Sequence, residues 1–210
     1  MTYSVLAARG VILAAALALT ALAALHVLKR DLDPTRTMIS RYALGRYGWV
    51  MSLCFAAFAA GSACLFVALV VDASSLLSRI GLASLFSAAV GLAMAARFPM
   101  DPVSTPPAQM SFSGKMHGVA FLIGVPCQIL AVLLLSLTLG EPPSHASLPL
   151  LALTGAIWLS LGIMISVMLI VGPGKPPNPE GPERFIGVPN RMFMVAYGVW
   201  LMVAAWPMAR

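Results

Sequence analysis

Charged side chains are scarce in this chain: Asp, Glu, Lys and Arg together make up 10% of its 210 residues. A soluble domain usually carries about 25% charged residues, so the sequence lacks the polar surface that a water-soluble fold needs. Hydrophobic residues make up 60% instead, and the mean hydropathy is +0.93. The composition indicates one compact membrane domain over residues 1–210, without a separate soluble domain.

Cysteine and the common cofactor motifs are also scarce or absent. The three cysteines, Cys54, Cys64 and Cys127, lie in apolar stretches without CxxC spacing. We therefore expect no disulfide framework and no cysteine metal site. The sequence contains no GxxxxGK[ST], GxGxxG, GxSxG or HExxH pattern, so no motif indicates nucleotide binding, a nucleophilic serine or a zinc protease. We predict no cofactor.

The positive net charge has a membrane explanation. The chain carries a formal charge of +6, which in a soluble protein would suggest nucleic acid as a partner. Basic residues that flank membrane helices instead meet anionic lipid headgroups. We therefore expect membrane lipids as partners and no nucleic acid.

Apolar stretches long enough to cross a bilayer dominate the chain. A spanning helix needs about 20 mostly apolar residues, because each residue rises about 1.5 Å through a hydrocarbon core of about 30 Å. The sequence predicts an all-α fold, a polytopic bundle of six transmembrane helices in three hairpins. The predicted helices cover about 5–28, 48–72, 77–98, 116–140, 148–172 and 190–209.

The distribution of basic residues predicts the orientation. Of the 13 Lys and Arg residues, ten lie in or beside the long first, third and fifth loops. Because basic loops stay on the cytoplasmic side, we expect the long loops in the cytoplasm and both termini outside. The expected location is a prokaryotic inner (plasma) membrane. The ten basic residues of the long-loop side are Lys29, Arg30, Arg36, Arg41, Arg46, Arg97, Lys115, Lys175, Arg184 and Arg191.

Two helices carry features that predict their packing. The third contains small residues at three- and four-residue spacing, among them Ser84, Ala88 and Gly91. Small residues allow close helix contact in lipid, so we expect this helix to be central. The fourth contains Gln128 near its middle, beside Pro126, and we expect this amide to bond a neighbouring helix.

The first loop is the richest polar segment. It contains HVLKRDLDP at 26–34 and SRYALGRYGW at 40–49. The spacing of Ile39, Tyr42 and Ala43 predicts a short helix lying in the membrane interface, from which Arg41 and Arg46 would reach lipid phosphates. A solvated connector between two helices is the alternative.

These two motifs resemble the six-helix membrane family known as domain of unknown function 998. FPMDP at 98–102, SGKMHG at 113–118 and GVPNR at 187–191 also resemble that family. The resemblance spans nearly the whole chain and implies a six-helix fold but no activity, because the family is itself uncharacterised. The family is distantly similar to FRAG1/DRAM-type membrane proteins, some of which are linked to lipid remodelling.

Polar residues at the long-loop ends of the helices form the candidate site. Ionisable groups at a membrane boundary are costly unless they are paired or hydrated, so their clustering suggests a function. In the simplest static arrangement, Asp33 or Asp101 would pair with Arg191 or Arg97. The candidate site consists of Asp33, Ser40, Arg41, Asp101, His117 and Arg191.

Several functions remain open at this point. The cluster would bind a lipid headgroup, with arginines on phosphate; in a catalytic version, His117 would act as a base oriented by Asp101. An accessory subunit of a larger membrane complex is the second hypothesis. A third is a haem or metal site formed by His26 and His117, which the predicted topology places at the same membrane depth. The sequence favours binding without catalysis.

Overall fold

The computed structural model describes residues 3–139, 147–171 and 181–210. Residues 140–146, which include His145, and residues 172–180, which include Lys175 and most of the Pro-rich segment, lie outside the described part. Within the described part the chain forms six long α-helices and no strands. The helices are α1 (Tyr3–Leu28), α2 (Gly48–Leu69), α3 (Leu76–Arg97), α4 (Phe112–Thr138), α5 (Ser147–Val171) and α6 (Gly187–Ala209).

The six predicted stretches are therefore confirmed as helices, and two of them, α4 and α6, begin earlier than predicted. α4 begins at Phe112 because the Ser111 hydroxyl accepts a hydrogen bond from the Gly114 N–H and caps the helix earlier than expected. α6 begins at Gly187 and contains Pro189 in its first turn. Proline is tolerated there because first-turn N–H groups have no partner within the helix.

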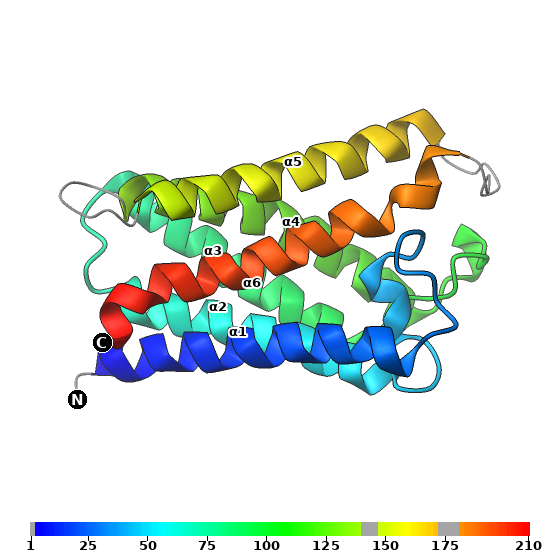
Figure 1. Ribbon diagram of the computed structural model, residues 1–210, viewed down its shortest axis with the longest axis horizontal. Coiled ribbons are helices and arrows are strands. Elements are labelled where there is room, and N and C mark those ends of the chain that lie inside the picture. The colour runs from blue at the N-terminus through cyan, green and yellow to red at the C-terminus, as the bar shows by residue number, and fades with distance from the viewer. Residues whose placement is uncertain (1–2, 140–146, 172–180) are drawn as a thin grey trace.

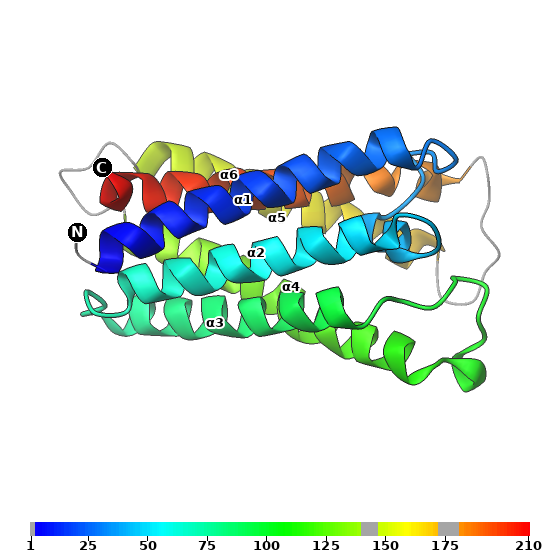
Figure 2. The ribbon, with the colours of Figure 1, turned by 90° about the horizontal axis from the view of Figure 1, so that it is seen from below.

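The helices pack as a ring in chain order. Each helix contacts the next along the chain, and α6 returns to α1. The contact between α4 and α5 is the least extensive of these. Both termini lie at one end of the bundle, and the loops after α1 and α3 lie at the other (Figures 1 and 2).

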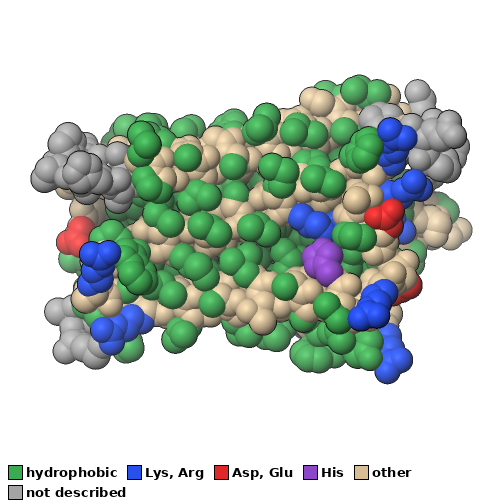
Figure 3. All heavy atoms as spheres, viewed as in Figure 1, with side chains coloured by type: hydrophobic (Ala, Val, Ile, Leu, Met, Phe, Trp, Pro, Cys, Tyr) green, Lys and Arg blue, Asp and Glu red, His purple; other side chains and the backbone are tan. Residues whose placement is uncertain are grey.

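The outer surface matches a bilayer. All six helices are long and apolar enough to cross a membrane. In Figure 3, most Lys and Arg side chains lie toward the two ends, one lies further in beside a His, and the remaining surface between the ends is mostly apolar. The chain is an integral membrane protein, because only such an environment accommodates this exposed apolar band.

Hydroxyl and indole groups link the helices inside the bundle. The Ser62 and Tyr197 hydroxyls are 2.6 Å apart and join α2 to α6. Trp200 Nε1 donates to Ser136 Oγ at 2.8 Å, and Ser136 Oγ lies 2.8 Å from Thr154 Oγ1. These contacts join α6, α4 and α5 where water is absent, so they help to select one arrangement of the helices.

Small residues bring α3 and α4 together. A Cβ added to Gly91 would lie 2.6 Å from the Gly124 Cα, so the two backbones touch at this point. The predicted small-residue face is thus used for close packing. The expected central place of α3 is wrong, however, because α2 has the larger buried share of its span (56% against 44%). α2 contacts the three helices α1, α3 and α6, whereas α3 makes its extensive helix contacts with α2 and α4.

A valine at Gly91 should separate α3 from α4. We expect Gly91→Val to lower the free energy of unfolding by about 1–3 kcal/mol, because the added atoms meet backbone that cannot yield. Thermal denaturation in detergent measures the change. Gly155→Val on α5 is the matched control, because a Cβ at Gly155 meets no atom within 4 Å. Equal destabilisation by both variants would contradict the close packing.

Candidate functional site

The first loop forms the predicted short helix, but this helix is part of the bundle. η1 (Ile39–Ala43) is a 3-10 helix, and its residues Ile39 and Tyr42 are 3% and 1% exposed. The predicted short helix is therefore confirmed, and its apolar side chains contact protein; its position in the membrane interface stays a prediction. These side chains pack because α2 and α6 both contact this segment.

Side chains from α6 hold the start of η1. Asn190 Oδ1 accepts a hydrogen bond from the Ile39 N–H at 2.7 Å. Arg191 donates to the Thr37 carbonyl at 2.7 Å, and the Gly187 N–H donates to the Thr35 carbonyl at 2.8 Å. Gly187 is required here, because a Cβ would overlap the Pro34 carbonyl oxygen.

Lys29 holds the end of η1. Its ammonium donates to the Tyr42 carbonyl at 3.1 Å and also to the Leu44 carbonyl. Lys29 is only 6% exposed. It is therefore not available to lipid headgroups, although the sequence places it among the basic residues that flank the helices. A cation beside the last carbonyls of a helix is electrostatically favourable.

The Arg191 guanidinium donates hydrogen bonds to neutral groups and not to a carboxylate. Its Nε donates to His26 Nε2 at 2.7 Å, and its guanidinium also donates to the Tyr42 hydroxyl at 2.8 Å. Because arginine has no acceptor, His26 Nε2 must accept, and Nδ1 must carry the proton that it donates to Leu22 O at 2.7 Å. Both nitrogens of His26 are used, so this geometry does not favour His26 as a haem or metal ligand.

The third loop builds a second cluster at the start of α4. Asp101 accepts hydrogen bonds from the Ser111 N–H and hydroxyl, both at 2.7 Å. His117 Nδ1 lies 2.9 Å from the Phe98 carbonyl and donates to it. Asp101 therefore supports the cap of α4. The catalytic hypothesis required Asp101 to orient His117, and Asp101 does not do so.

The remaining predicted residues lie on the surface. Asp33 accepts hydrogen bonds from the Thr35 hydroxyl and N–H and forms an ion pair with Arg36 at 3.4 Å. The hydrogen bonds from Thr35 lower the pKa of Asp33, and the nearby Arg36 adds to this effect. Arg41 is exposed. Across the described ranges, neither Asp33 nor Asp101 forms an ion pair with Arg191 or Arg97.

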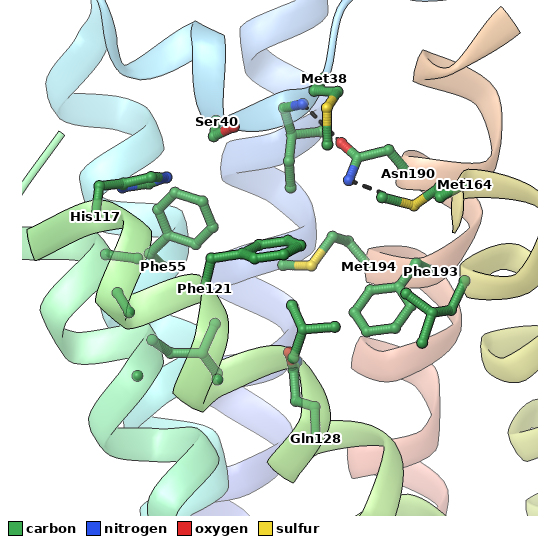
Figure 4. A pocket seen from close by; sticks show the side chains of 18 residues that line it. Met38, Ser40, Phe55, His117, Phe121, Gln128, Met164, Asn190, Phe193 and Met194 are labelled. Atoms are coloured by element: carbon green, nitrogen blue, oxygen red, sulfur yellow. Dashed lines mark hydrogen bonds between the residues drawn. The ribbon is translucent and has the colours of Figure 1, made fainter. Parts of the chain in front are cut away.

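Two of the six predicted residues meet at a cavity beneath η1. Ser40 and His117 both line this cavity, which has a volume of about 90 Å³ and a mostly apolar wall (Figure 4). Asn190 lies on the opposite side, and its dashed contacts in Figure 4 lead to Ile39 and Met164. The lining residues are Met38, Ile39, Ser40, Phe55, Gly91, Leu92, Ala95, His117, Ala120, Phe121, Gly124, Val125, Gln128, Leu161, Met164, Asn190, Phe193 and Met194.

Gln128 lines the deep end of the cavity. It is 2% exposed, and its Nε2 has no hydrogen-bond partner within the described residues. The Tyr197 hydroxyl on α6 lies near the amide, but no contact of Gln128 Nε2 has hydrogen-bond geometry, and this hydroxyl is already bonded to Ser62. The expected bond from this amide to a neighbouring helix is therefore not made through Nε2.

Sequence reasoning missed Lys29, Tyr42, Asn190 and Gln128 as site residues. The first three lie inside the motifs HVLKRDLDP, SRYALGRYGW and GVPNR, so the motifs carried a signal. The contacts of Asn190 with Ile39 and of Tyr42 with Arg191 join residues more than a hundred positions apart. Spacing along the chain does not reveal such pairs.

Replacing Arg191 should destabilise the bundle rather than only alter binding. We expect Arg191→Gln to lower the free energy of unfolding by about 3–5 kcal/mol, because His26, Thr37 and Tyr42 lose a donor in a part-buried place. Thermal denaturation in detergent measures the loss. Arg41→Gln is the exposed control and should change stability by less than about 0.5 kcal/mol. An Arg191→Gln protein as stable as the wild type would contradict the structural role of these hydrogen bonds.

Comparison with known proteins identifies a family and no characterised relative. No curated protein and no solved structure matches the chain, so the similarity to FRAG1/DRAM-type proteins stays a prediction. The family model described as "Protein of unknown function (DUF998)" matches residues 12–207. This range contains all five motifs that hold η1 and the start of α4. The chain belongs to the DUF998 family of membrane proteins.

Proposed function

We propose that this protein binds a membrane lipid in the cavity beneath η1. The observation that carries this proposal is that the cavity adjoins an apolar groove between α4 and α5 and shares wall residues with it. Phe121, Val125, Leu161 and Met164 line both the cavity and this groove. A lipid chain can therefore lie along α4 and α5 while its end reaches the cavity.

The polar lining gives the site a means of selecting a ligand. Ser40 offers a hydroxyl, and His117 offers Nε2, since Nδ1 is held by Phe98 O. The exposed residues Arg41, Arg46 and Lys115 lie at the same end of the bundle, outside the cavity lining, and would contact the anionic headgroups of the surrounding bilayer. Inside the cavity, recognition of the polar part of the ligand thus rests on Ser40 and His117.

Binding fits this geometry better than catalysis. A hydrolytic site would need a base with an orienting acid, and His117 is oriented by a backbone carbonyl. The accessory-subunit hypothesis makes a different prediction, because such a protein would co-purify with stoichiometric partners. Purification in mild detergent followed by native mass spectrometry distinguishes a bound lipid from a bound protein.

Blocking the passage should remove the lipid. Val125 lines both the cavity and the groove. In Val125→Phe the larger side chain would occupy space that the lipid needs, so we expect at least a tenfold lower lipid occupancy in native mass spectrometry. Leu130→Phe, also on α4 and half-exposed but outside both linings, is the matched control and should retain the lipid. Equal lipid occupancy in the two variants, or co-purification of a protein partner in place of a lipid, would contradict the proposal.

We also propose that the long loops face the cytoplasm, in keeping with the excess of basic residues there. A cysteine at Val103, which is exposed in the third loop, should react with a membrane-impermeant maleimide only after the membrane is opened. A cysteine at Ser74, which is exposed in the α2–α3 turn, should react in intact cells. The wild-type protein measures background from its own cysteines. The reverse pattern would contradict this orientation.

A further inference from the structure

The deep end of the cavity contains an unused hydrogen-bond donor. Gln128 is 2% exposed, and its Nε2 is the one buried side-chain nitrogen or oxygen without a partner in the described part of the chain. An unpaired polar group buried inside a membrane bundle is costly, because the apolar surroundings do not replace its lost hydrogen bond. A ligand oxygen in the cavity would satisfy this donor.

The cavity is unsuited to charge. Its described lining contains no Lys, Arg, Asp or Glu, and the nearby cations Lys29 and Arg191 are occupied by η1 and His26. A phosphate or carboxylate placed inside would be desolvated without a counter-ion, which is strongly unfavourable. The polar lining groups Ser40, His117, Asn190 and Gln128 instead suit a neutral, hydrogen-bonding molecule.

The depth of Gln128 gives a further constraint. Gln128 lies eleven positions after His117 on α4, which corresponds to about 16 Å along the helix axis. A charged headgroup keeps a phospholipid at the membrane surface and prevents its polar atoms from reaching such a depth. Only a lipid with a small, uncharged polar group brings an oxygen there.

We infer that the ligand of this cavity is an uncharged lipid, with a carbonyl or hydroxyl oxygen that accepts a hydrogen bond from Gln128 Nε2. Its apolar body lies against Phe121 and Val125 and extends into the α4–α5 groove. This inference rests on the proposed function and names the chemical class that the site accepts. Quinones, diacylglycerols and long-chain alcohols share this chemistry.

The test measures binding of neutral lipids to delipidated, full-length protein in detergent. The probes are decylubiquinone, dioctanoylglycerol and decanol, with didecanoylphosphatidylglycerol as the charged comparison. We expect at least one neutral probe to raise the melting temperature and bind with a measurable dissociation constant, and the phosphatidylglycerol to bind at least tenfold more weakly. The probe that binds identifies the type of neutral lipid. Selective binding of the charged probe, or of none, would overturn the inference.

Replacing Gln128 isolates the hydrogen bond. In Gln128→Leu we expect the dissociation constant of the neutral probe to rise about tenfold, the effect of losing one buried hydrogen bond. Gln128→Met is the second variant if leucine does not fold, because its flexible chain fills the same space. Ser136→Ala removes another buried polar group of α4, outside the cavity lining, and should leave binding unchanged.

The outcomes separate the two proposals. If Val125→Phe abolishes probe binding and Gln128→Leu weakens it, both proposals are supported. If Val125→Phe abolishes binding while Gln128→Leu binds like the wild type, lipid binding stands and the role of Gln128 is wrong. If neither variant affects binding, the cavity is not the site and both proposals fail.

Discussion

The site depends on how a very short helix is held in place. A 3-10 helix of five residues makes few hydrogen bonds of its own and is not stable alone. Asn190 and Arg191 bind its beginning, and Lys29 binds its end. Because η1 contributes Ile39 and Ser40 to the cavity wall, these three side chains also determine whether the cavity exists.

Two of these side chains are cations in a part of the protein with little water. Lys29 is almost fully buried, and the hydrogen-bond partners of Arg191 are two carbonyls, a hydroxyl and an imidazole nitrogen. Carbonyl dipoles thus replace the carboxylate counter-ions that one would first expect. Such an arrangement is specific, because each cation needs several acceptors in one geometry, and only the folded loop supplies them.

The least extensive contact in the helix ring leaves an apolar groove beside the cavity. α3 and α4 are joined closely through Gly91, whereas α4 and α5 contact each other less extensively. Phe121 and Val125 line the groove on one side, and Leu161 and Met164 line it on the other. The same four residues also line the cavity, so the packing of α4 against α5 determines what separates the cavity from the bilayer.

The sequence alone determined the six helices, their membrane character and the family, because hydrophobic length and local motifs are properties of contiguous residues. It also placed Ser40 and His117 correctly among the residues of one end. The tertiary structure decided which polar residues meet. Arg191 pairs with His26 rather than with Asp33, and Asp101 supports Ser111 rather than His117. Those choices depend on distances between helices far apart in the chain, and membrane depth alone does not specify them.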